Sequence, residues 1–86
     1  MTHPYLEISY RGGKPYLGYL YLKRRASVAK STRIGQLVID LDGEGKVIGI
    51  ELFAFDAATI AALQSELRQR GVTNVTESEL RPLIAA

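Results

Sequence analysis

Apolar and polar residues alternate with a period of two over most of the first 53 residues, which is the pattern of half-buried β-strands. The alternation is clearest in Tyr5-Leu-Glu-Ile-Ser-Tyr10. Glycine, proline or charged residues interrupt it at short intervals, as turns between strands do. The pattern predicts a small antiparallel sheet of about five strands, over residues 5–10, 16–23, 27–34, 36–42 and 46–53.

The first turn of this sheet is predicted at Arg11-Gly-Gly-Lys14. A Gly-Gly pair suits a two-residue hairpin loop, because both central positions need a positive φ. Closing the hairpin there sets Ile8 opposite Leu17. The same register sets Leu6 opposite Tyr19, so that apolar side chains share one face.

The second predicted strand is apolar on both of its faces. Its side chains divide into two sets, Leu17, Tyr19 and Tyr21 on one face and Tyr16, Leu20 and Leu22 on the other. One helix cannot cover both faces of a single sheet. The strand therefore predicts a second covering layer, formed by the helices or by another copy of the chain, and it leads us to expect a homodimer.

After the last strand the apolar period changes from two to 3.6, which predicts an amphipathic helix over residues 57–70. Asp56 is a good N-cap, and Gly71 suits the position just after the helix. The predicted buried stripe consists of Ala57, Ile60, Ala61, Leu63 and Leu67. Thr76-Glu-Ser-Glu79 resembles a capping box, so a short C-terminal helical turn is also expected. The predicted fold class is α+β, with residues 1–86 in one domain.

The fourth and fifth strands form a hairpin over residues 36–53 that contains several carboxylates. If Gly45 is the left-handed residue of the turn, Asp42 faces Lys46. That register sends Asp40 and Glu51 to opposite faces of the sheet, which argues against one shared site, although a slip of one residue would reverse the argument. A carboxylate-based metal or acid–base site is accordingly kept as an alternative, with Asp40, Asp42 and Glu51 as its candidates. Gly49 is expected to allow the close approach of a neighbouring backbone or aromatic ring.

Charge is divided unevenly along the chain. Residues 1–36 hold seven Lys or Arg against one Glu, a net charge of +6, whereas residues 37–86 hold four against eight, a net charge of −4. The division indicates either two halves that attract each other or a polyanionic partner for the basic half. Clustered cations beside a strand with tyrosines suit phosphates and unstacked bases. Nucleic-acid binding is therefore a second alternative, through Lys23, Arg24, Arg25, Lys30 and Arg33.

The residue inventory argues against an enzyme. The chain has no cysteine and one histidine, His3, so it cannot assemble a histidine pair for zinc, a hydrolytic triad or a cysteine nucleophile. No phosphate-binding or dinucleotide-binding glycine loop is present, and no cofactor is expected. No apolar run approaches the roughly 20 residues that span a bilayer, and no signal peptide is recognisable, so a cytoplasmic location is expected.

The central hairpin resembles the signature of the domain of unknown function 2283 family, a group of small bacterial proteins. The family shows an aspartate, an acidic turn ending in glycine, and then an apolar pair followed by Gly-Ile-Glu-Ile. The positions that match are Asp40, Gly45, Gly49, Ile50 and Glu51, with Tyr10 and residues 20–22 resembling its first two strands. Two family acidic positions hold Arg11 and Gly18 here. The resemblance implies a small antiparallel sheet followed by a helix, and no established activity.

These observations lead to one main hypothesis and two alternatives. We expect a non-enzymatic protein-interaction or regulatory module of a bacterial cell, with a homodimer and a small protein partner as the expected assemblies. The nucleic-acid and carboxylate hypotheses stay open beside it.

Overall fold

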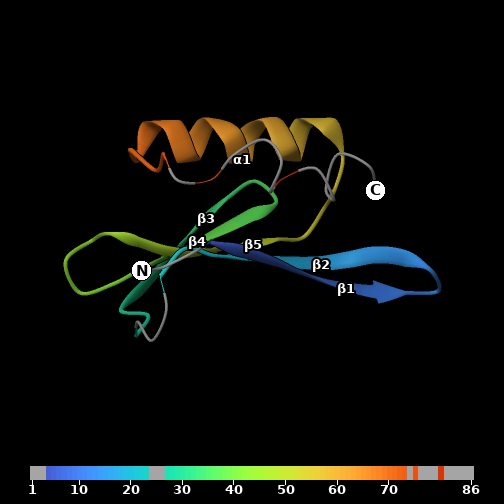
Figure 1. Cartoon of the computed structure of the whole chain (residues 1–86), viewed down its shortest axis with the longest axis horizontal. Helices are drawn as coiled ribbons and strands as arrows, with labels where there is room; N and C mark the ends of the chain where they lie inside the picture. The colour runs from blue at the N-terminus through green and yellow to red at the C-terminus, as the bar shows by residue number, and fades with distance from the viewer. Residues whose placement is uncertain (1–3, 24–26, 74, 76–79, 81–86) are drawn as a thin grey trace.

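In the computed structural model, five antiparallel strands form one open sheet and a single helix lies along one face of it (Figure 1). The structure describes residues 4–23, 27–73, 75 and 80. The sheet has the strand order β1-β2-β5-β4-β3. Its elements are β1 (Tyr5–Arg11), β2 (Lys14–Tyr21), β3 (Lys30–Ile34), β4 (Leu37–Leu41), β5 (Val47–Leu52) and α1 (Ala57–Gln69). The predicted α+β class, with five strands and one helix, is confirmed.

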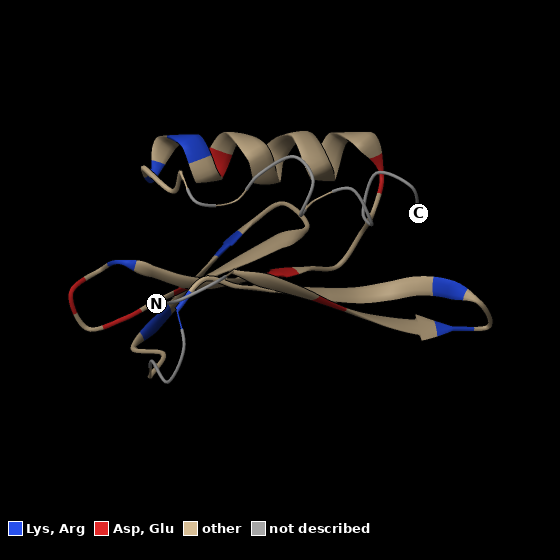
Figure 2. Cartoon of the chain, in the orientation of Figure 1, with Lys and Arg blue, Asp and Glu red and all other residues tan. Residues whose placement is uncertain are grey.

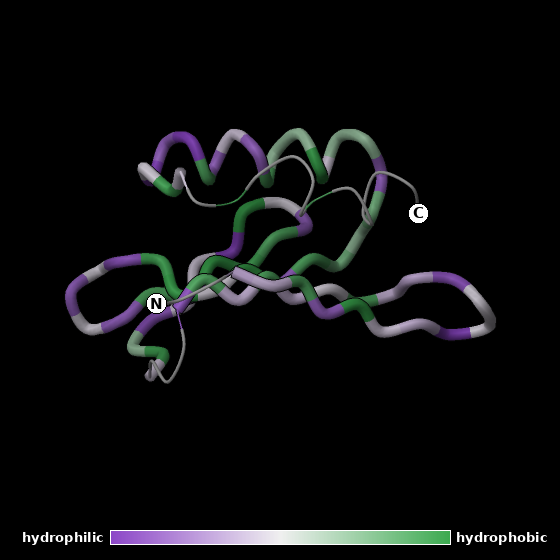
Figure 3. The backbone as a smooth tube through the Cα atoms, viewed as in Figure 1, coloured by the Kyte–Doolittle hydropathy of each residue, from purple (hydrophilic) through white to green (hydrophobic). Residues whose placement is uncertain are grey.

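The core lies between α1 and the face of the sheet turned toward it. Hydrophobic positions gather along the middle of the sheet, and hydrophilic ones at the tips of the two long hairpins (Figure 3). Leu20, Leu37, Ile39, Ile50, Leu52 and Leu63 are fully buried. Leu80 is also buried in this core. The remainder of the predicted C-terminal turn, residues 76–79, lies outside the described residues.

The buried stripe of α1 differs from the predicted one. Ile60, Leu63 and Leu67 are buried as expected, but Ala57 and Ala61 are exposed and Thr59 is buried. The helix is therefore rotated slightly toward Thr59, because its large side chains determine which face meets the sheet. No helix in the described part of the chain is long and apolar enough to cross a membrane.

Both predicted ends of α1 are confirmed. The Asp56 carboxylate accepts a hydrogen bond from the Thr59 amide at 2.9 Å, which satisfies one of the free donors of the first turn. Gly71 has a φ of 71°, the left-handed conformation that ends many helices. The helix thus starts and stops where its local sequence dictates.

Substituting Asp56 tests how much the cap stabilises the fold. Asp56→Ala should lower the melting temperature by about 5 °C, because the Thr59 amide loses its acceptor. The hydrogen bonds with Thr59 lower the pKa of Asp56. The carboxylate therefore contributes stability that is present above the unfolded pKa and is lost as pH falls through the folded one. Thermal unfolding at pH 7 and pH 3 checks this, and Asp56→Asn, which keeps a capping oxygen without the charge, should lose little at pH 7.

The β1–β2 hairpin has a different register from the predicted one. Ile8 lies opposite Gly18, and Leu6 opposite Leu20, because the pairing shifts by one residue between Ser9 and Tyr10. One extra β2 residue, Tyr16, forms a bulge there. The regular hairpin would place Leu6 and Ile8 on the face away from the helix. The bulge places both against the core, so burial of apolar surface overrides the simple turn register.

Candidate functional site

The sheet face turned away from α1 is not covered by any described helix or strand (Figure 1). We call it the open face. The strand registers place on it the side chains of Tyr5, Glu7, Ser9, Leu17, Tyr19, Tyr21, Ser31, Arg33, Val38, Asp40 and Glu51, together with Gly49. The predicted division of β2 into two apolar faces is confirmed, and its Leu17, Tyr19 and Tyr21 belong to the open face.

A second bulge, in the β4–β5 hairpin, brings the predicted carboxylates to one face. The turn is as expected, with Gly45 at a φ of 81° and the Asp42 amide donating to the Lys46 carbonyl at 2.9 Å. One extra residue in β5, Ile48, then shifts the pairing so that Asp40 lies opposite Gly49. Val38 is consequently opposite Glu51, and Asp40 lies on the same face as both. The prediction that Asp40 and Glu51 face opposite ways is wrong, because the bulge supplies the one-residue slip.

The bulge is anchored by β2. The Ile48 carbonyl accepts hydrogen bonds from the Leu22 and Lys23 amides, at 3.0 and 3.2 Å. The carbonyl of the bulged residue Ile48 thus has its hydrogen-bond donors in the segment that follows β2. This contact fixes the register on which the open face depends.

Asp40 is the buried centre of a hydrogen-bond network on the open face. Asp40 is only 6% exposed to solvent. One carboxylate oxygen accepts from the Tyr19 hydroxyl at 2.6 Å, and the other accepts from the Ser31 hydroxyl at 2.6 Å. Hydrogen bonds to an ionised group are among the strong ones in proteins, and a carboxylate this buried needs them. The network ties β2, β4 and β3 together across the sheet.

Gly49 makes room for this network. A Cβ at Gly49 would overlap the Tyr19 ring, which lies directly over the glycine on its way from β2 to Asp40 in β4. The expectation that Gly49 allows an aromatic ring to approach is confirmed. Any larger residue here would displace the ring and break its hydrogen bond.

Three tyrosines form a cluster beside the network. The Tyr5 and Tyr21 rings stack with centroids 4.5 Å apart and an interplanar angle of 14°. The Tyr19 and Tyr21 rings are also 4.5 Å apart and are tilted by 52°. The Tyr21 hydroxyl donates to Glu7 at 3.4 Å. We call Tyr5, Tyr19 and Tyr21 the tyrosine cluster, and carboxylates lie on both sides of it.

The surroundings of the cluster oppose ionisation of its phenols. Burial, and then the hydrogen bond to Asp40, raise the pKa of Tyr19 well above its usual range. Burial, followed by the charge of Glu7, raises the pKa of Tyr21. Both hydroxyls therefore stay protonated as hydrogen-bond donors.

A tyrosine titration tests this environment. Among the five tyrosines, Tyr19 should stay protonated as pH rises past 10 and ionise only when the protein unfolds. Because its folded pKa exceeds the unfolded one, its stabilising contribution is complete below about pH 10 and is lost as pH rises further. Absorbance at 295 nm against pH measures the step. Tyr19→Phe should remove it, and Tyr10→Phe, which removes the hydroxyl of an exposed tyrosine, should leave it.

Asp42 serves the turn rather than a shared site. It accepts hydrogen bonds from the amides of Glu44 and Lys46, at 2.9 and 3.0 Å, and forms an ion pair with Lys23 at 3.6 Å. The acidic residues of this turn lie at the tip of the hairpin (Figure 2). Among the described residues, no group of three or more Asp, Glu, His or Cys side chains is arranged to hold a metal ion. Asp40 and Glu51 share a face, and Asp42 does not join them in a site.

The predicted basic residues are spread over different places. Lys23 is paired with Asp42, while Lys30 is exposed on the edge strand β3. Arg33 lies over the Phe53 ring at 5.3 Å and donates to the Gly35 carbonyl at 3.0 Å. Arg24 and Arg25 lie outside the described residues. The described cations do not gather around the tyrosine cluster, and nucleic-acid binding through the five residues stays a prediction.

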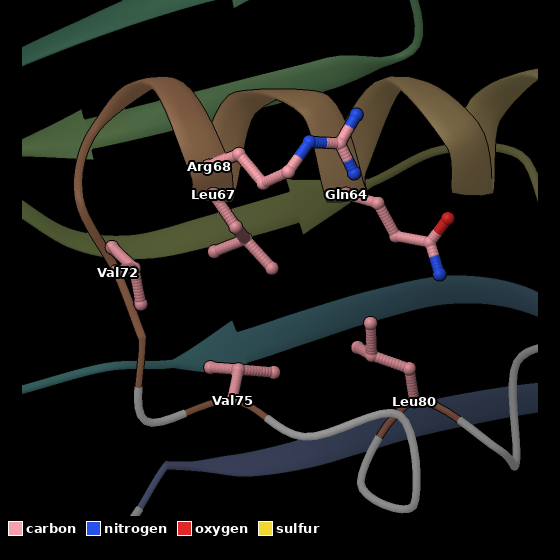
Figure 4. A pocket seen from close by; sticks show the side chains of 6 residues that line it. All are labelled: Gln64, Leu67, Arg68, Val72, Val75 and Leu80. Atoms are coloured by element: carbon pink, nitrogen blue, oxygen red, sulfur yellow. The ribbon is translucent and has the colours of Figure 1, made fainter.

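A hollow of about 350 Å³ lies beside the C-terminal half of α1. Leu67, Val72, Val75 and Leu80 point into it from different segments, with Gln64 and Arg68 on the helix above (Figure 4). Four of its six lining residues are apolar, and none of them is a predicted site residue. It has the character of an incompletely filled edge of the core.

Comparison with known proteins adds no relative. No family model, no curated protein and no solved structure matches this chain. Membership of the domain of unknown function 2283 family therefore stays a prediction, and the open face has to be interpreted from its own residues. Of these, sequence reasoning missed the roles of Tyr5, Tyr21 and Ser31. The predicted register of the first hairpin put Tyr5 on the face opposite to Tyr21, and only the bulge in β2 brings the two rings together.

Proposed function

We propose that this chain is a non-enzymatic protein-interaction or regulatory module of the bacterial cytoplasm, that it works as a homodimer, and that its open face binds another protein. The observation that carries the proposal is the tyrosine cluster on an uncovered sheet face. Membership of the domain of unknown function 2283 family is part of the proposal and agrees with the small sheet and following helix.

The composition of the open face supports protein binding. Tyrosine is one of the residue types enriched at protein interfaces, and Leu17 and Val38 add apolar surface on the same face. Tyr5 is 45% exposed, so its ring offers contact area to a partner. Tyr19 is held by Asp40 and Tyr21 by stacking, so both rings are ordered before a partner binds. Side chains ordered in advance lose less entropy on association.

The same geometry supports a binding module over the two alternatives. Asp40 accepts from two hydroxyls and Asp42 from two amides, which uses the candidate carboxylates for structure. Glu7 and Glu51 flank Tyr19 on neighbouring strands, and their charge would repel a phosphate backbone near the aromatic rings. Nucleic-acid binding would require a different surface, and a salt titration of binding tests it.

Affinity capture with two charge-matched variants tests the proposed surface. The first, Leu17→Lys with Val38→Lys, places two cations on the open face. The second, Ala57→Lys with Ala61→Lys, places two cations on exposed helix positions. Circular dichroism first establishes that both variants fold. We expect a protein captured in stoichiometric amount by the wild type and the helix variant, and lost with the open-face variant.

Two results would contradict the proposal. Equal capture by all three proteins would place binding elsewhere, and no stoichiometric partner from the native host would remove the interaction function. Because Leu17 pairs with Ser9 of β1, sedimentation equilibrium of the open-face variant distinguishes loss of the partner from loss of the dimer.

A further inference from the structure

The sheet has two edges, and only one of them carries the usual protection against strand addition. The β3 edge is short, with five residues, and carries Lys30 and Arg33. The β1 edge has seven residues, with no proline and no lysine. The bulge of the β1–β2 hairpin lies in β2, so the backbone of β1 itself stays regular. Proteins use short edges, charged side chains, prolines and bulges to prevent pairing with other chains. β1 is longer than β3 and has no proline, lysine or bulge, and its two charges, Glu7 and Arg11, have opposite signs.

We propose that β1 pairs antiparallel with β1 of a second copy, about a two-fold axis at Ile8. This inference rests on the homodimer of the proposed function and places its interface at the β1 edge, so the second copy extends the sheet and does not cover the open face as the sequence led us to expect. The unpaired amides and carbonyls along the outer side of β1 would bond to their equivalents in the second copy. The described residues place no strand on that side of β1.

The side chains of β1 are complementary to themselves in this register. On the open face, Tyr5 lies opposite Arg11 of the second copy. The Arg11 guanidinium lies over the Tyr16 ring of its own hairpin, 4.5 Å from the ring centroid, and would exchange that ring for Tyr5 in a second cation–π contact. Glu7 lies opposite Ser9 of the second copy and diagonal to its Arg11, so each carboxylate approaches a guanidinium and faces a small polar residue. The two-fold axis makes each of these contacts twice. No like charges are directly opposite each other in this β1–β1 interface, which we call the seam; the two Glu7 side chains lie diagonally across the axis, and each is also diagonal to an Arg11.

On the helix-facing side of the β1–β1 interface, pairing buries additional apolar surface. Leu6 and Ile8 are only half-buried, although both pack against the core. In the paired strands Ile8 meets its own copy, and Leu6 meets Tyr10, which is 59% exposed in the single chain. The two-fold axis is perpendicular to the sheet, so both helices lie on one side and the two open faces become continuous. The dimer thereby doubles the surface proposed to bind a partner.

Sedimentation equilibrium of three variants tests the seam by charge reversal. Ser9→Glu places a glutamate opposite Glu7 of the second copy at two symmetric positions, and should weaken the dimer about tenfold. Glu7→Lys combined with Ser9→Glu puts opposite charges at the same positions and should restore association to at least the wild-type level. Gln36→Glu adds the same charge at an exposed turn far from β1 and should change nothing.

A cysteine crosslink provides an independent measurement. The chain contains no cysteine, so Ile8→Cys is the only thiol in that variant. Oxidation should yield a covalent dimer, whereas Thr32→Cys on the β3 edge should form no crosslink under the same conditions. A wild type that is monomeric throughout the micromolar range would overturn both the seam and the homodimer. A wild-type dimer that Ser9→Glu leaves unchanged, with no Ile8→Cys crosslink, would overturn the seam alone.

Discussion

Replacing Gly49 with alanine should destabilise the fold by about 2–3 kcal/mol, from the loss of one hydrogen bond to a buried charge and the strain of a displaced ring. The added methyl group would occupy the space of the Tyr19 ring. Since the ring must move, the Tyr19 hydroxyl can no longer donate to Asp40. Asp40 is only 6% exposed and would then keep the hydrogen bond from Ser31. Chemical denaturation gives the free energy of unfolding.

Gly43→Ala is the matched control for this experiment. Gly43 lies in the same hairpin, has no atom within 4 Å of an added Cβ, and should tolerate alanine within about 0.5 kcal/mol. A double-mutant cycle with Tyr19→Ala identifies the cause. If the ring is what collides with the methyl group, Gly49→Ala should cost much less once the ring is gone. An undiminished cost in that background would show that the glycine serves a backbone purpose instead.

The elements of this fold could be predicted from the sequence, and their pairing register could not. Alternation locates a strand within two or three residues, and Asp56 and Gly71 locate both ends of the helix. The β1–β2 and β4–β5 hairpins, however, each contain one extra residue, Tyr16 and Ile48 respectively, that no turn signal reveals. A bulge is selected by burial across the whole sheet, because a slip of one residue exchanges the two faces. Local sequence does not contain that information.

The candidate site shows the same limit in its chemistry. Asp40 and Glu51 stood out as carboxylates in one hairpin, but a wrong register separated them. The partners of Asp40 come from outside that hairpin, since Tyr19 is 21 residues away in the chain and Ser31 is nine. Only the strand order β1-β2-β5-β4-β3 places β2 and β3 on either side of the hairpin. The strand order brings the two hydroxyl donors to the hairpin. The hairpin sequence itself supplies the acceptor, Asp40, and Gly49 beneath the Tyr19 ring.

Asp40→Ala should destabilise the wild-type protein by about 2 kcal/mol, since it removes two charge-assisted hydrogen bonds and restores part of that loss by no longer burying a carboxylate. Asp40→Asn, which keeps one acceptor oxygen, should cost about half as much. Ser31→Ala should cost less than Tyr19→Phe, because Ser31 is exposed and water can replace its hydroxyl. Denaturant unfolding of the four variants gives this order.

The effect of Asp40→Ala on stability should change sign when the two hydroxyl donors are absent. In a protein that already carries Tyr19→Phe and Ser31→Ala, the Asp40 carboxylate is buried without its two side-chain donors, so Asp40→Ala should be neutral or stabilising there. The same substitution thus acts in opposite directions in the two backgrounds, because a buried charge stabilises a fold only while its hydrogen bonds are intact. An equal loss of stability in both backgrounds would show that Asp40 is held by something other than the two hydroxyls.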